Sequence, residues 1–130
     1  MMELTERQRL YLPKTVHWER EDLHLFLDPE APHWIGTDWR GAEILRWIEE
    51  GHPFGEIVQR YTVRHGVAAA RAWLHAHDFI QALLRAEFAS REPVESLPYL
   101  GRAAYANARP KALKELWFHT NNICNLSCVH

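Results

Sequence analysis

The residues with the most definite chemistry stand close to the last residue of the 130-residue sequence. Cys124 and Cys128 are its only two cysteines, and His130 follows them. A structural disulfide framework would spread its cysteines through the body of the fold, so this spacing indicates a ligand motif in a reducing compartment. Zinc binding by the three residues would lack a fourth protein ligand, and an incidental tail is the other alternative.

The sequence around the two cysteines resembles the opening of the radical S-adenosylmethionine enzymes. An apolar segment typical of a strand, residues 113–120, precedes Cys-Asn-Leu-Ser-Cys-Val-His at 124–130. In that family a Cys-x3-Cys-x2-Cys loop after the first barrel strand binds a [4Fe-4S] cluster, to which S-adenosylmethionine adds the fourth ligand. The resemblance implies that Cys124 and Cys128 are iron–sulfur ligands and that the third ligand would directly follow His130.

We therefore expect residues 113–130 to be the truncated start of a radical S-adenosylmethionine domain. Residues 91–112 lose periodicity and contain three prolines, which is typical of a linker. Residues 1–90 then form the one complete domain. On this interpretation the fragment itself is not an enzyme, and the cluster and S-adenosylmethionine belong to the parent enzyme alone.

Three short segments of the body have the apolar patterns of strands. They are residues 16–18, 23–27 and 33–37, and the second alternates leucines with His24 and Phe26. The four polar residues 19–22 are enough for a hairpin turn, and two prolines force a second turn before residue 33. The sequence predicts a three-stranded antiparallel meander.

The apolar period becomes helical after Asp38, which suits a helix N-cap. Gly51 and Gly66 each end a helix, Pro53 suits the start of the second, and a third helix covers about residues 67–88. The predicted buried positions of the first two helices are Gly41, Ile44, Leu45, Ile48, Phe54, Ile57, Val58 and Tyr61. The predicted fold is α+β and winged helix-turn-helix-like, with three strands, three helices and a C-terminal tail.

This order of elements, with three internal motifs, resembles the PqqD-like family of RiPP recognition elements. The motifs are Asp-Trp-Arg-Gly-Ala-Glu-Ile-Leu at 38–45, Phe-Gly-Glu-Ile-Val at 54–58, and the Phe-Ile-x-x-Leu pattern at 79–83. A departure is Glu87, where the family often has glycine. The resemblance implies that the domain binds the leader of a ribosomally made precursor peptide and delivers it to a radical S-adenosylmethionine domain that modifies the peptide.

A short sheet with an open edge strand can accept an extended peptide as a further strand. We expect the third strand to be this edge and one flank of the third helix to lie beside it. The candidate peptide-binding residues are His33, Trp34, Ile35, Gly36 and Thr37 on the strand and Ala70, Arg71, Leu74, His77 and Asp78 on the helix. The alternative is that this helix flank packs on the N-terminal arm or on the rest of the enzyme.

Charge and hydropathy restrict the other partners. Residues 1–90 carry ten Lys and Arg against fourteen Asp and Glu, which disfavours a winged-helix DNA binder, the least favoured alternative. No apolar run is long enough to cross a bilayer, and no secretion signal precedes the domain. We expect a cytoplasmic protein with no nucleic-acid or membrane partner, whose partners are the leader peptide and the rest of the enzyme. A structural or oligomerisation cap of that enzyme is the other alternative.

Overall fold

The structure is a computed structural model that describes residues 3–29 and 33–94. The chain divides into two units, residues 1–99 and residues 100–130. The second unit lies wholly outside the described residues, and so do the predicted strand at 113–120 and the cysteines Cys124 and Cys128. The boundaries expected at residues 90 and 112 stay predictions.

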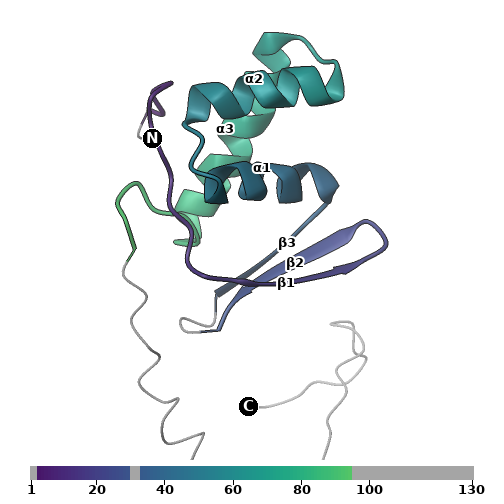
Figure 1. Cartoon of the computed structure of the whole chain (residues 1–130), viewed down its shortest axis with the longest axis vertical. Coiled ribbons are helices and arrows are strands. Elements are labelled where there is room, and N and C mark those ends of the chain that lie inside the picture. The colour runs from purple at the N-terminus through teal and green to yellow at the C-terminus, as the bar shows by residue number, and fades with distance from the viewer. Residues whose placement is uncertain (1–2, 30–32, 95–130) are drawn as a thin grey trace, which may run out of the picture. The chain divides into compact units, whose positions relative to one another are not determined.

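The first three elements form one antiparallel sheet with β2 in its centre (Figure 1). Its strands are β1 (Val16–Arg20), β2 (Leu23–Asp28) and β3 (His33–Thr37). The predicted turn of four residues is wrong, because β1 continues to Arg20, which pairs with Leu23. The turn therefore consists of two residues, and its first, Glu21, takes a left-handed backbone with φ of 55°.

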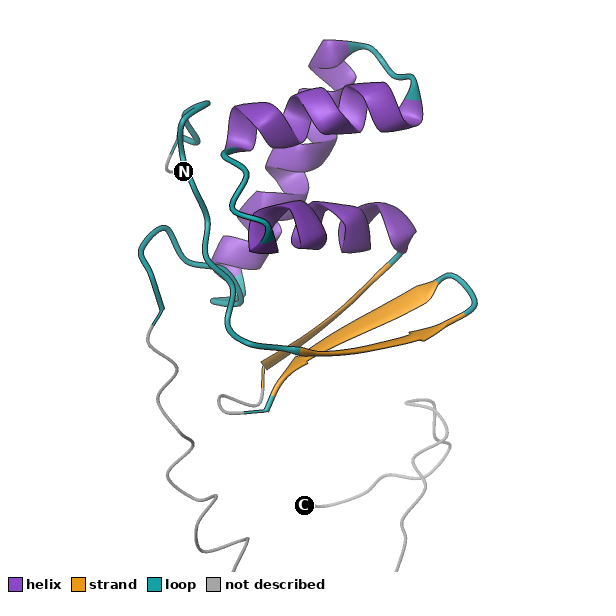
Figure 2. Cartoon of the chain, in the orientation of Figure 1, coloured by secondary structure: helices purple, strands orange, loops and turns teal. Residues whose placement is uncertain are grey.

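Three helices follow the sheet, as the sequence predicts, and they lie to one side of it (Figure 2). They are α1 (Trp39–Glu49), α2 (Phe54–His65) and α3 (Ala69–Arg85). The α+β fold of a three-stranded antiparallel sheet followed by three helices is confirmed.

Local capping explains where α1 begins and where α2 ends. The side chain of Asp38 accepts hydrogen bonds from the backbone N–H of Arg40 at 3.0 Å and of Gly41 at 3.1 Å, which confirms it as the N-cap of α1. Gly66 ends α2 in the left-handed conformation, with φ of 61°, and its N–H donates to the carbonyl of Thr62. Only glycine adopts this conformation without steric cost.

The end of α3 differs from the sequence prediction. The helix stops at Arg85, three residues before Phe88, and Glu87 takes a positive φ of 56°. This is the position at which the PqqD-like resemblance leads one to expect glycine. A left-handed backbone ends the helix here even without glycine, and it lets Phe88 turn back into the core, where its side chain is buried.

The core lies between the inner face of the sheet and the three helices. Phe26 of β2 is buried, and the buried residues of α1 and α2 include seven of the eight predicted positions; Val58 is half-buried. In α3 the buried stripe is narrower than predicted. Trp73 and Leu74 are 42% and 50% exposed, whereas Ile80 and Leu83 are fully buried.

The N-terminal arm, residues 3–12, completes this core in a way that the sequence analysis did not predict. Leu4 and Leu10 are buried. The carbonyl of Gln8 accepts a hydrogen bond from the N–H of Phe54 at 2.8 Å, and the carbonyl of Glu6 accepts one from Gly55 at 2.9 Å. Pro53 offers no side-chain cap, so the arm satisfies N–H groups that the first turn of α2 leaves unpaired.

None of the helices among the described residues is both long enough and apolar enough to cross a membrane.

Candidate functional site

The candidate site is the open edge of β3. One side of this strand pairs with β2 over five residues, from His33 opposite Asp28 to Thr37 opposite His24. No strand pairs with its other side among the residues that the structure describes. In an antiparallel pair, successive residues alternate in which side their N–H and C=O groups face. Every second residue of β3 therefore presents its backbone groups at the open edge.

The side chains of β3 point alternately toward the helices and away from them. Ile35 is half-buried and packs against the core, whereas Trp34 is 67% exposed on the opposite face. A peptide that pairs with the backbone of β3 would thus have side chains on two faces, and only one of these faces would be turned toward the helices. The sheet register positions all five strand residues of the predicted site along the open edge.

Gly41 of α1 brings the end of β3 close to α3. A Cβ atom at Gly41 would touch the side chain of Thr37 and would lie 2.9 Å from the ring of Phe79. Thr37, Gly41 and Phe79 therefore meet at one point, and Phe79 is the α3 side chain that lies there. Its ring is half-buried, on the border between the core and the exposed face of α3.

Helix geometry shows which exposed residues of α3 lie close to Phe79. At 100° per residue, Ala82 lies about 60° from Phe79, and Leu74 lies about 140° away on the same helix. Ala82 and Ala86 are exposed and small. Ala82 is thus an exposed α3 residue near Phe79, and Ala86 is the C-cap residue that directly follows the helix.

Three helix residues of the predicted site, Ala70, Leu74 and His77, lie about 140–180° from Phe79 around the axis of α3. The ring of His77 stacks on Trp73 at 4.4 Å and lies 6.5 Å from Phe54, at the start of α2. His77 therefore lies on the side of α3 that faces the start of α2. A wide apolar arc does not reveal which of its two borders meets the sheet, so whether Ala70, Leu74 and His77 bind a peptide stays a prediction.

Arg71 and Asp78, the polar residues of the predicted flank, lie on the exposed side of α3. They are about 80° and 100° from Phe79 on the helix, so they lie nearer to the border with β3 than Leu74 does. Asp78 also contacts Nδ1 of His77 at 3.3 Å. Whether these residues bind a peptide stays a prediction.

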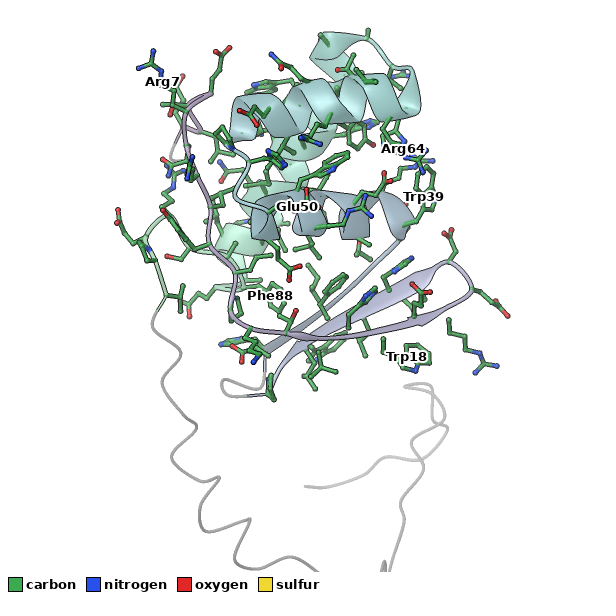
Figure 3. The ribbon with its side chains drawn as sticks, in the orientation of Figure 1. Arg7, Trp18, Trp39, Glu50, Arg64 and Phe88 are labelled. Carbon is green, nitrogen blue, oxygen red and sulfur yellow. The ribbon has the colours of Figure 1, made fainter. Side chains whose placement is uncertain are left out.

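The second feature of the surface is the outer face of the sheet. Leu23, Leu25 and Leu27 alternate with Phe26 and therefore point away from the helices, and residues of the neighbouring strands join them. The apolar side chains of this outer face that are at least 37% exposed are Val16, Trp18, Leu23, Leu27 and Trp34. Figure 3 shows Trp18 on the side of the sheet away from the helices. An exposed apolar surface with two tryptophans is typical of an interaction site.

A third feature is an ion-pair cluster where α1 meets the end of α2. Glu43 contacts Nε of Arg64 at 2.8 Å and Nε2 of His65 at 3.3 Å. Burial lowers the pKa of His65, and this effect outweighs the opposing influence of Glu43; Arg40 and Arg64 lower it further. Arg64 of α2 is thus engaged by a carboxylate.

Comparisons with known proteins include a match to the fold. No protein-family model matches the chain, and no curated protein is similar to it in sequence. A solved structure of TbiB1 in complex with the TbiA(beta) leader peptide is similar, with a TM-score of 0.51 and 22% identity. The match covers 68% of this chain and 95% of that one. At this identity the similarity shows that the two proteins share a fold.

Proposed function

We propose that residues 3–94 bind the leader of a ribosomally made precursor peptide by adding it as a fourth strand beside β3. The observation that carries the proposal is the open edge of β3 next to the exposed side of α3, in a fold shared with a protein that was solved with a leader peptide. Main-chain hydrogen bonds to β3 would fix the register of the peptide. Contacts with Phe79 and Ala82 would select its side chains.

The parent protein, on this proposal, is a radical S-adenosylmethionine enzyme that modifies the bound peptide. Cys124 and Cys128 would supply two of the three thiolates that hold its [4Fe-4S] cluster, and the third would follow His130. The described residues would bind and deliver the peptide, while the cluster and S-adenosylmethionine would supply the radical chemistry. The support for this part is the sequence resemblance at residues 113–130.

A titration tests peptide binding directly. The probe is a synthetic, fluorescently labelled peptide with the leader sequence of the short open reading frame beside the parent gene. Its fluorescence anisotropy should rise and saturate at one peptide per domain, and a scrambled peptide of the same composition should bind at least tenfold more weakly. Equal binding of the two peptides would contradict a register fixed by β3.

A second candidate function, an oligomerisation cap, is favoured by the outer face of the sheet. The exposed Trp18 and Trp34 lie on this face, away from the helices. A cap that self-associates through it should sediment as a dimer, and Trp18→Ser, on β1, should weaken the dimer without changing leader affinity. A monomeric wild-type chain at high concentration would exclude this function.

A further inference from the structure

Three side chains with metal-ligating atoms converge on the inner face of the β1–β2 hairpin. Nε2 of His17 lies 3.0 Å from Nδ1 of His24, and the same Nδ1 lies 3.5 Å from Oε2 of Glu19. The three ligand atoms are all within 4.8 Å of one another. The two-residue turn places them there, because Glu19 pairs directly with His24 and His17 is on the same face two residues earlier.

These distances are close to those of a coordination sphere. In a tetrahedral zinc site the ion lies about 2.0–2.1 Å from each nitrogen, which places two ligating nitrogens about 3.3–3.4 Å apart. The observed distances of 3.0 and 3.5 Å lie on either side of this value. The third pair, His17 and Glu19, lies within 4.8 Å, so a rotation of the exposed Glu19 side chain would bring the three atoms around one ion.

Packing holds the two imidazoles in place. The ring of His17 stacks on Phe26 at 4.3 Å with an angle of 5° between the planes, and on His24 at 5.2 Å. Phe26 belongs to the buried core. The fold therefore largely sets the orientation of the two rings. This lowers the conformational entropy that the ligand side chains lose when an ion binds.

The cluster opens on a cavity of about 520 Å³ between the hairpin and the helices. The cavity wall opposite the hairpin includes Trp39, Glu43 and Arg46 of α1 and Arg64 of α2. Three protein ligands beside an open space leave the fourth position of a tetrahedral ion to water or another small ligand.

We propose that His17, Glu19 and His24 form a binding site for a divalent transition-metal ion of the zinc type. Two imidazoles and one carboxylate suit zinc, nickel, copper or iron, whereas magnesium and calcium prefer all-oxygen ligands. The bound ion cross-links β1 to β2 through side chains. This site lies on β1 and β2 and is separate from the open edge of β3.

Zinc titration tests the site, with the thiolates removed first. In a chain that carries Cys124→Ser and Cys128→Ser, isothermal titration with ZnCl₂ should show one bound ion. His24→Ala should weaken its affinity at least tenfold, since losing even the hydrogen-bond partner of a ligand costs about 10–100-fold. Glu19→Gln should also weaken the zinc affinity. Because the side chain of Glu19 is 66% exposed, this variant should keep the fold even if His24→Ala unfolds the domain.

The matched control is His52→Gln. His52 contacts two carboxylates, at 2.8 Å from Glu56 and 3.2 Å from Glu50, but neither His17 nor His24 is among its partners. Its replacement should leave the zinc affinity unchanged. The proposal is overturned if the thiol-free chain binds no zinc, or if Glu19→Gln, folded by circular dichroism, binds zinc as tightly as that chain does.

Discussion

Gly41→Val should destabilise the domain by about 3 kcal/mol, at the upper end of what overpacking a core costs. Gly41 is buried where α1 crosses the end of β3, and even a single Cβ atom there would lie 2.9 Å from the ring of Phe79 and would touch Thr37. Valine adds two further carbon atoms. Helix propensity slightly favours valine over glycine, but by less than the steric cost. Urea unfolding followed by circular dichroism measures the loss.

Gly36→Val is the matched control for this substitution. A Cβ atom at Gly36 would meet its nearest neighbours at 3.7 and 4.0 Å, which are ordinary contacts, and valine is favoured in strands. Its unfolding free energy should stay within about 0.5 kcal/mol of wild type. In a chain that already carries Phe79→Ala, Gly41→Val should lower the unfolding free energy by less than it does in wild type. If the loss is the same in both backgrounds, Gly41 and Phe79 do not contact each other as described.

Ala82→Asp should weaken leader binding at least tenfold, while Leu74→Asp should leave it unchanged. Ala82 is exposed and lies about 60° from Phe79 on the helix, and on our proposal a bound peptide covers its side chain. Covering a neutral polar group without a partner costs about 1–3 kcal/mol and covering a carboxylate costs more, so a loss of at least tenfold, about 1.4 kcal/mol, is expected. The anisotropy titration described above measures the effect.

The same two variants also distinguish the border of α3 near Ala82 from the flank predicted from sequence. Both residues are exposed, so both carboxylates should be tolerated in the free domain, which circular dichroism checks. The sequence analysis assigns peptide binding to the flank around Leu74, and the function proposed here assigns it to the opposite border of α3. A strong effect at Leu74 with none at Ala82 would return the site to the flank predicted from sequence.

The elements of the fold were predictable because each has a local cause. Alternation with period two marks the strands, the Asp38 side chain caps α1, and Gly66 allows the left-handed residue that ends α2. The end of α3 was missed because Glu87 adopts the conformation that glycine usually supplies. Local sequence does not reveal that a glutamate will accept this conformation when tertiary packing buries Phe88.

The strand half of the predicted site depends on element order, whereas its helix half depends on tertiary packing. Any three-stranded meander leaves its last strand at an edge, so residues 33–37 follow from element order alone. Which border of α3 meets that edge depends on how the helices cross, and this is set by contacts such as Gly41 with Phe79. The cluster of His17, Glu19 and His24 likewise needs the hairpin register, which a turn of two rather than four residues determines.

Amide hydrogen exchange on β3, read residue by residue by NMR with and without saturating leader peptide, tests the central claim most directly. In the free domain, one alternating set of β3 amides, either residues 34 and 36 or residues 33, 35 and 37, should exchange fast because it faces the open edge. The peptide should protect this set, while the outward amides of β1 stay unchanged. Unchanged exchange along β3 with the peptide bound, or protection along β1 instead, would contradict strand addition at β3.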